Sequence, residues 1–259
     1  MALIHMNVFS YALAQAVSLD VLLPECAQYP APSEPKKYPV LYLLHGLSDD
    51  HTIWQRRTRI ESYVTGKELI VVMPSTHRAF YTNTVSGQKY FDYVARELPA
   101  ICKAYFPVAE GRENTFVAGL SMGGYGSYKL ALTCPEQYAA AASLSGAINL
   151  EGMYKRRTVL GESNEFEYVF GKPRGIKGSE NDIFALAQKV IAAGGVKPKL
   201  YMACGTEDGL LCDSRLFKRR YGKSFDFTYE EGPGNHNWDF WDKYIQKVLA
   251  WLPIPANQK

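Results

Sequence analysis

Short apolar runs alternate with helix-patterned stretches along almost the whole chain, and this alternation is the strongest constraint on its fold. The central runs are apolar at nearly every position, which is typical of parallel strands covered on both faces. Alternating strands and helices predict an α/β fold with a mostly parallel central sheet, right-handed crossovers and helices on both faces. The predicted strands are Val17–Pro24, Pro39–Gly46, Glu68–Pro74, Asn114–Ser121, Ala140–Gly146, Lys199–Gly205 and Ser224–Glu231.

Four further stretches are predicted to be helices. They either carry apolar residues at helical spacing or have a helix-like composition and follow a predicted strand. We expect Pro99 to bend the first of them. Gly194 and Gly195 are expected to end the third, because glycine is a common helix stop. The predicted helices are Tyr90–Phe106, Gly123–Pro135, Asp182–Gly195 and Asn237–Pro253.

The pattern lapses between Asn149 and Asn181, where the chain is polar and rich in glycine, lysine and arginine. We predict that residues 149–181 form a variable insertion over one end of the sheet, suited to a lid or a substrate pocket. The chain has 259 residues, of which 47% are hydrophobic, so it can bury one sizeable core. We therefore expect a single domain over residues 1–259.

Composition argues against several classes of partner. The net charge is +3 and the basic residues are scattered, so no nucleic-acid surface is expected. The N-terminus lacks the pattern of a signal peptide, and no apolar run reaches the roughly 18 residues that favour a membrane span. Five cysteines without tight spacing argue against a disulfide framework or a zinc site. They predict reduced thiols in a cytoplasmic protein, with Cys134 and Cys204 in or near the core.

The stretch FVAGLSMGGYG, residues 116–126, places glycines on both sides of one serine. Gly119–Gly123 fits the pattern G-x-S-x-G, with an apolar strand before Ser121 and a helix after it. This setting is typical of a nucleophile elbow, a strand-to-helix turn that exposes the serine Oγ, and glycine lets neighbouring backbones approach closely. The alternative is an ordinary glycine-rich turn. We predict that Ser121 is a nucleophile.

A serine nucleophile needs a base to take its proton. His236 lies in GPGNHNW, the loop between the last predicted strand and the last helix. This loop is expected to lie at the same carboxyl edge of the sheet as Ser121. We predict that His236 is this base; the alternative is a loop histidine that caps the final helix. The other histidines are His5 near the N-terminus, His45 at a strand end, and His51 and His77 in loops.

The histidine in turn needs an acid to fix its tautomer. The run CGTEDGLL follows the next-to-last predicted strand and offers two carboxylates, Glu207 and Asp208. We favour Asp208, because the glycine after it permits a sharp turn toward His236, and Glu207 is the alternative. The resulting chain order of serine, aspartate and histidine is that of an α/β-hydrolase.

Two backbone N–H groups must face the oxyanion that forms during acyl transfer. The first is predicted at Met122, directly after the nucleophile and at a helix N-terminus. The second is predicted at Leu47, in the run LLHGLSDD after an early strand, with Gly46 allowing close backbone approach.

Several motifs together resemble the esterase D group of α/β-hydrolases, which includes the S-formylglutathione hydrolases and the bacterial tributyrin esterases. They are PVLYLLHGLSDDHTIW, LIVVMPST, FVAGLSMGGYGSYKLAL, CGTEDGLL and GNHNWDFW, whose order and spacing match over nearly the whole chain. The likeness is greatest to the tributyrin esterases. It implies an α/β-hydrolase fold, with Ser121, Asp208 and His236 as the catalytic residues and Leu47 and Met122 as oxyanion donors.

The resemblance implies a serine carboxylesterase that hydrolyses small esters with short acyl chains through an acyl-enzyme, without a metal or organic cofactor. One alternative is hydrolysis of the thioester S-formylglutathione. Another is cleavage of feruloyl or acetyl groups from plant polysaccharide, for which Trp54, Tyr81 and Trp238 are candidate aryl contacts or simply packing residues. A catalytically inactive binding module is a third alternative. A homo-oligomer is compatible with the sequence.

Overall fold

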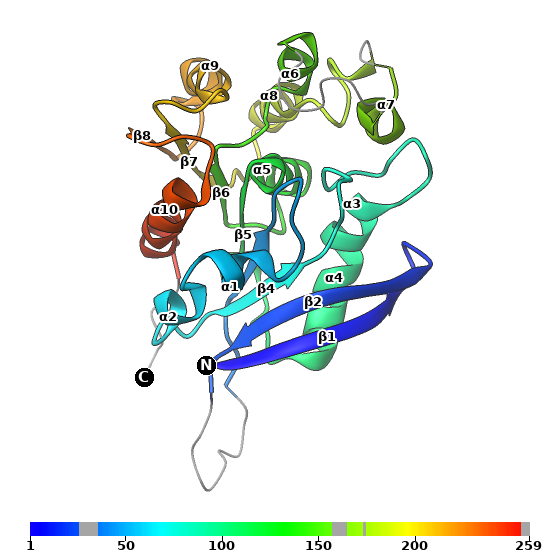
Figure 1. Ribbon diagram of the computed structural model, residues 1–259, viewed down its shortest axis with the longest axis vertical. Coiled ribbons are helices and arrows are strands. Elements are labelled where there is room, and N and C mark those ends of the chain that lie inside the picture. Colours follow the sequence, from blue (N-terminus) through cyan, green and yellow to red (C-terminus); the bar gives the residue numbers. More distant parts are fainter. Residues whose placement is uncertain (26–35, 157–164, 173–174, 255–259) are drawn as a thin grey trace, which may run out of the picture.

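The computed structural model describes residues 1–25, 36–156, 165–172 and 175–254, and its central feature is a single sheet (Figure 1). Within these residues the strands follow the order β1-β2-β4-β3-β5-β6-β7-β8. β1 and β2 form an antiparallel hairpin, β2 pairs antiparallel with β4, and the remaining pairs are parallel. The α/β fold with a mostly parallel sheet is therefore confirmed.

The predicted strands are all present, with one addition at the sheet edge. The bounds are β1 (Ala2–Ser10), β2 (Gln15–Leu23), β3 (Val40–Leu44), β4 (Ile70–Pro74), β5 (Thr115–Leu120), β6 (Ala140–Leu144), β7 (Lys199–Gly205) and β8 (Phe227–Gly232). β1 was not among the predicted strands. Its residues alternate between partly buried and exposed, as expected for an edge strand with one face on the protein.

The helices cover both faces of this sheet. They are α1 (Ile53–Arg57), α2 (Ile60–Val64), α3 (Tyr90–Asp92), α4 (Leu98–Tyr105), α5 (Met122–Thr133), α6 (Leu150–Arg156), α7 (Glu165–Phe170), α8 (Ile183–Ala193), α9 (Leu211–Tyr221) and α10 (Trp238–Trp251), with a π-helical turn at Tyr93–Glu97 and a 3₁₀ turn at Arg112–Asn114. None of the helices in the described part of the chain has the length and apolar composition needed to cross a bilayer.

Helix boundaries follow local chemistry. Asp182 caps α8 by accepting the amide N–H groups of Phe184 and Ala185, and Gly194 ends it in the left-handed conformation that favours glycine. At Pro99 the chain passes from the π-helical turn into α4. Proline has no N–H to donate, and the π-helical turn directly before it, in which the Leu98 N–H donates to Tyr93 O, is a common place for a helix to change its path.

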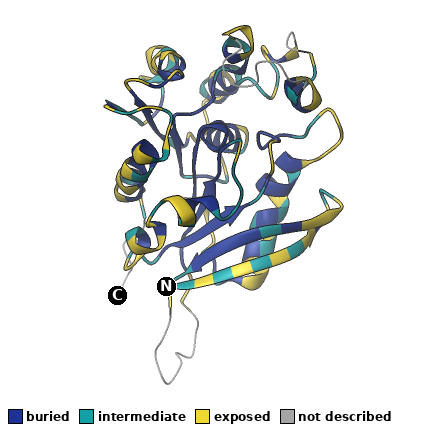
Figure 2. Ribbon diagram, in the orientation of Figure 1, coloured by how far each residue is buried: buried dark blue, intermediate teal, exposed yellow. Residues whose placement is uncertain are grey.

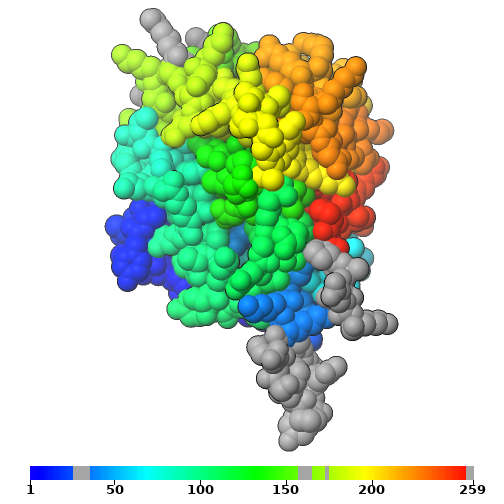
Figure 3. All heavy atoms as spheres, turned by 180° about the vertical axis from the view of Figure 1, so that it is seen from behind, coloured from blue at the N-terminus to red at the C-terminus, as the bar shows by residue number. Residues whose placement is uncertain are grey.

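Two apolar layers sandwich the sheet, because successive residues of a strand face opposite sides. In β3, Leu41 and Leu43 face the layer built with α1, α2 and α10, whereas Tyr42 faces the layer built with α4, α5, α8 and α9. Figure 2 shows the central strands buried, whereas the edge strand β1 alternates between intermediate and exposed residues, and further exposed residues lie on the outer sides of the helices. Seen from behind, α5 lies between the α3–α4 segment and the C-terminal segment (Figure 3).

The cysteines carry no disulfide among the described residues, where Cys102, Cys134, Cys204 and Cys212 are free thiols. Cys204 is buried in the core as predicted, and Cys134 is half-buried. The prediction for Cys26 falls outside the described residues.

The carboxyl ends of the parallel strands meet at one edge of the sheet, where the predicted site residues are placed. The strand registers align Leu44 with Gly119, Leu120 with Leu144, and Gly205 with Gly232. The predicted insertion contributes α6 and α7, which lie with α8 and α9 at the end of the molecule that appears at the top of Figure 1.

Candidate active site

Ser121 occupies a strained turn between β5 and α5. Its φ of 51° and ψ of −114° are unusual for a residue with a side chain, and such strain persists only where the surroundings impose it. The backbone around it is fixed, because its N–H donates to Leu144 O (2.8 Å) and its carbonyl accepts the N–H of Ala147 (3.0 Å).

Glycines make this turn possible by letting three backbone segments pack together. A Cβ atom on Gly119 would overlap the carbonyl oxygen of Gly123. A Cβ atom on Gly123 would lie 2.5 Å from Leu44 O, at the end of β3. The G-x-S-x-G pattern therefore has a physical reason here: a side chain at position 119 would push α5 away from β5, and one at position 123 would push α5 away from the end of β3.

Three side chains from distant parts of the chain form a hydrogen-bonded chain at this edge. His236 Nε2 lies 2.9 Å from Ser121 Oγ, and His236 Nδ1 lies 2.9 Å from Asp208 Oδ2. Ser121 follows β5, Asp208 follows β7, and His236 lies in the loop between β8 and α10. The structure thus brings together the three residues that the sequence predicted as nucleophile, acid and base.

Asp208 is charged and orients the imidazole. Burial by itself raises the pKa of this carboxyl, but the hydrogen bonds from His236 and from the amide of Leu210 outweigh it and leave the pKa below its ordinary value. An ionised Asp208 accepts the Nδ1 proton of His236. The Nε2 lone pair then faces the hydroxyl of Ser121, which is the tautomer that a general base requires.

The alternative acid, Glu207, points elsewhere. Its Oε2 accepts the amide N–H of Gly234, while Oε1 accepts the hydroxyl of Thr206. These bonds lower the pKa of Glu207, with the Gly234 amide as the largest cause. Glu207 therefore braces the loop that carries His236 without contacting the imidazole ring.

The other histidines have different partners. His45 is buried, and burial lowers its pKa to about 4. This neutral ring contacts Gly46 O through Nδ1 (2.7 Å) and accepts the N–H of Thr76 at Nε2 (3.0 Å). His77 packs edge-on against Tyr90, and His5 and His51 lie around Asp20.

The loop that carries Leu47 is held from several directions. Gly46 accepts both the His45 Nδ1–H and the amide N–H of Asp49, and the Asp49 carboxylate accepts the N–H of Gly46. In a trans peptide the C=O and N–H point in opposite directions. The carbonyl of the Gly46–Leu47 peptide is therefore engaged on one side while the Leu47 N–H faces the other.

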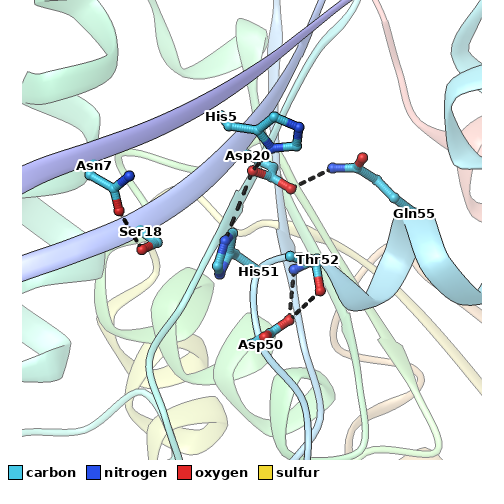
Figure 4. Close-up of polar contacts among 8 residues, drawn as sticks. All are labelled: His5, Asn7, Ser18, Asp20, Asp50, His51, Thr52 and Gln55. Atoms are coloured by element: carbon cyan, nitrogen blue, oxygen red, sulfur yellow. Dashed lines mark hydrogen bonds and ion pairs between the residues drawn. The ribbon is translucent and has the colours of Figure 1, made fainter.

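The far end of the same loop is anchored by the polar cluster in Figure 4. The buried carboxylate of Asp20 on β2 accepts Gln55 of α1 (2.7 Å), contacts His5 of β1 (2.7 Å) and lies 4.0 Å from His51 Nε2. Asp50 accepts the N–H and hydroxyl of Thr52 just before α1. Despite its two histidines, this cluster is not a metal site: no group of three or more His, Cys, Asp or Glu in the described ranges could hold an ion.

Met122, the other predicted oxyanion donor, is the first residue of α5. The first N–H groups of a helix have no acceptor within the helix, and the helix dipole favours negative charge beside them. The end of β3 and the start of α5 are in close backbone contact through Gly123, so the segment that leads from β3 toward Leu47 lies beside the N-terminal end of α5, where Met122 is the first residue.

The aromatic residues considered as aryl contacts are mostly packing residues. Trp54 and Tyr81 are fully buried, and they donate hydrogen bonds to Leu44 O (3.1 Å) and His45 O (2.9 Å) behind the Leu47 loop. Trp238 is half-buried against Trp54. Trp241 is not among the predicted site residues, although its ring meets the His236 ring edge to face at 5.0 Å. Its position in the first turn of α10, five residues after His236, is the feature of the sequence that could have indicated this contact.

Comparison with known proteins places this chain in a family. The family model described as "Putative esterase" matches residues 10–252. An acetyl esterase of Caldicellulosiruptor saccharolyticus is 32% identical, with 97% of this chain and 98% of the relative aligned.

Two solved structures from Staphylococcus aureus share the fold closely. The fluorophosphonate-binding serine hydrolase FphF is 33% identical with a TM-score of 0.88, and the S-formylglutathione hydrolase FrmB is 32% identical with a TM-score of 0.88. Both alignments cover 97% of this chain and 98% of the other. The chain therefore belongs to the esterase family, within the esterase D and S-formylglutathione hydrolase-like group of α/β-hydrolases, and it is a serine esterase.

Proposed function

We propose that Ser121 is the nucleophile, His236 the general base and Asp208 the acid of a carboxylesterase that works through an acyl-enzyme. The observation that carries this assignment is the pair of 2.9 Å contacts that join the three side chains at a strained strand-to-helix turn. A nucleophile and its base must lie within hydrogen-bond reach, and the base must be oriented by a third group.

In the acylation step, His236 Nε2 takes the proton of Ser121 as Oγ attacks the ester carbonyl. The carbonyl oxygen becomes an oxyanion between the N–H groups of Leu47 and Met122. The imidazolium is stabilised by the charged Asp208, and it gives its proton to the departing alcohol. Water then repeats the sequence on the acyl-enzyme, which releases the carboxylic acid and restores Ser121.

We propose acetyl and other short acyl esters of small alcohols as substrates, as in the tributyrin esterases that the sequence resembles. The support is the similarity to a relative named acetyl esterase along nearly the full length of both chains. Activity is expected to fall as the acyl chain grows beyond about four to eight carbons. A preference for long-chain esters would contradict this proposal.

Thioester hydrolysis is the second candidate, since one similar structure is named S-formylglutathione hydrolase. The feruloyl alternative has less support, because Trp54 and Tyr81 are too deeply buried to contact an aryl group. A panel of p-nitrophenyl esters of increasing acyl length, S-formylglutathione, acetylated sugars and methyl ferulate separates the candidates. The largest kcat/KM identifies the substrate class.

The catalytic assignment is tested by Ser121→Ala. We expect it to abolish both hydrolysis of p-nitrophenyl acetate and covalent labelling by a fluorophosphonate, with an unchanged circular dichroism spectrum. Retained turnover would remove Ser121 from the mechanism. Failure of the wild-type protein to label would instead support a binding module. The cytoplasmic location, the single domain over residues 1–259 and any homo-oligomer stay predictions, as does catalysis without a cofactor.

A further inference from the structure

One loop wraps around the end of β3 and the Leu47 turn. We call residues 76–81 the clamp loop. At one end, the Thr76 N–H donates to His45 Nε2 (3.0 Å); at the other, the hydroxyl of Tyr81 donates to His45 O (2.9 Å). Both contacts are buried, so hydrogen bonds shielded from water join the clamp loop to His45, two residues before Leu47.

The clamp loop is held in a strained shape. His77, Phe80 and Tyr81 have φ values of 48°, 51° and 53°, in the left-handed region that bulky residues avoid. Such a conformation persists only where packing imposes it. That packing includes α7, because the Phe80 ring meets the Phe170 ring at 5.2 Å, and both rings pack against Tyr125 of α5.

Arg78, in the middle of the clamp loop, reaches two places at once. Its Nε and Nη2 donate to the two carboxylate oxygens of Glu165 on α7, with a distance of 2.7 Å for Nη2. Its Nη1 donates to the carbonyl oxygen of Leu47 at 3.3 Å. A guanidinium is suited to this task, because its planar fork grips a carboxylate with one edge and leaves further N–H groups free.

We propose that Arg78 is a positioning residue that couples α7 of the 149–181 segment to the oxyanion donor at Leu47. This inference rests on the proposed function. The Leu47 N–H lies in the Gly46–Leu47 peptide plane, and its position also depends on the following Leu47–Ser48 plane, because the two planes meet at the Leu47 Cα. The Gly46 carbonyl of the first plane is held by His45, and the Leu47 carbonyl of the second is held by Arg78. The position of α7 therefore bears on the geometry of the oxyanion site through one side chain.

Loss of the Arg78 contacts is expected to lower the rate of catalysis and to have little effect on the free energy of unfolding. The Arg78 side chain is 48% exposed and that of Glu165 24% exposed, and partly exposed ion pairs contribute little to folding. A donor aimed at an oxyanion, in contrast, stabilises the transition state more than the bound substrate, so its loss lowers kcat more than it changes KM.

The experiment compares Arg78→Ala, Arg78→Lys, Glu165→Gln and the double variant R78A/E165Q in hydrolysis of p-nitrophenyl acetate. We expect R78A to lower kcat about 10-fold, less than the full loss of an oxyanion donor, while KM stays within about two-fold. R78K keeps the positive charge but lacks the planar guanidinium, and its kcat is expected to lie between those of R78A and the wild type. E165Q is expected to lose about three-fold, and the double variant no more than R78A, because Glu165 acts through Arg78.

Lys155→Ala is the matched control, because Lys155 pairs with Glu151 within α6 of the same segment and contacts neither Arg78 nor Leu47. It should match the wild type. The affinity for a trifluoromethyl ketone, which forms a tetrahedral adduct with the serine, should fall in R78A in step with kcat.

The proposal is overturned if R78A keeps the wild-type kcat, if only its KM rises, or if the losses of R78A and E165Q simply multiply in the double variant. A fall in melting temperature that accounts for the lost kcat would also overturn it. Failure of the underlying function looks different: active Ser121→Ala would remove the serine mechanism, whereas R78A should still label fully with a fluorophosphonate, only more slowly.

Discussion

Gly205 and Gly234 pack so closely that a Cβ atom on Gly205 would overlap the carbonyl oxygen of Gly234. Gly205 ends β7 three residues before Asp208, and Gly234 precedes His236 by two. The amide of Glu207 donates to the same Gly234 carbonyl (3.1 Å). The contact between these two glycines thus sets the distance between the loops that carry the acid and the base.

Gly205→Ala should separate these two loops and disrupt the Asp208–His236 contact. We expect kcat for p-nitrophenyl acetate to fall at least 10-fold, and the free energy of unfolding to fall by about 1–3 kcal/mol, the usual cost of overpacking. Gly209→Ala is the control, because a Cβ atom there meets nothing within 4 Å and Gly209 is not among the glycines with a positive φ, so alanine fits this turn. Equal activity of the two variants would show that the packing of the loops does not govern the site.

Asp208→Asn and Glu207→Gln distinguish the two carboxylates. An amide at position 208 cannot hold the Nδ1 proton of His236 as a carboxylate does, so we expect kcat to fall by roughly 10³–10⁴-fold. Glu207→Gln keeps an oxygen to accept the Gly234 N–H and should stay within about three-fold of the wild type, since it removes a charge only from an exposed site. Steady-state kinetics on both variants decides the assignment, and the reverse order of effects would make Glu207 the acid.

Much of this arrangement was predictable because its signals are local. Strand ends, glycine positions and chain order placed Ser121, Asp208 and His236 at one edge of the sheet. Parallel topology then brings such ends together. The choice of Asp208 over Glu207 was made from one following glycine, and the structure separates the two by which of them contacts His236.

Other parts leave no local pattern. In β1 the exposed alternate positions include the apolar Leu3 and Phe9, so the two-residue period is obscured in the sequence, and the strand is defined by its pairing with β2. α9 was missed because its segment LCDSRLFKRRY is dominated by polar and charged residues and buries only a few side chains, such as Phe217, against the sheet. The contact of Arg78 with Leu47 joins residues 31 positions apart, so no spacing in the sequence signals it.

Acid should weaken folding through His45. Its pKa is about 4 in the folded protein, below the ordinary 6.5, because burial disfavours the charged ring. The unfolded chain therefore binds more protons between these values. The contribution of His45 is fully present above pH 6.5 and is lost as the pH falls toward 4. Between pH 7.5 and pH 5 we expect a loss of about 2 kcal/mol from this group.

Urea unfolding at both pH values measures this loss, with His45→Gln as the control. Glutamine does not titrate in this range, so the variant should be less stable at neutral pH but should lose about 2 kcal/mol less than the wild type on acidification. Equal losses in the two proteins would assign the pH dependence to other groups.

Trp241 is expected to hold the His236 ring through its edge-to-face contact. Trp241→Phe keeps an aromatic ring on this face of α10, whereas Trp241→Leu keeps bulk without one. Aromatic pairs contribute about 0.5–1.5 kcal/mol beyond the area they bury. If that contact orients the imidazole, Trp241→Leu should lower kcat about 3–10-fold at this energy and shift the pH profile of kcat/KM, and Trp241→Phe should do so less. If both variants kept the wild-type pH profile and lost only thermal stability, Trp241 would be a packing residue of α10 with no part in placing the base.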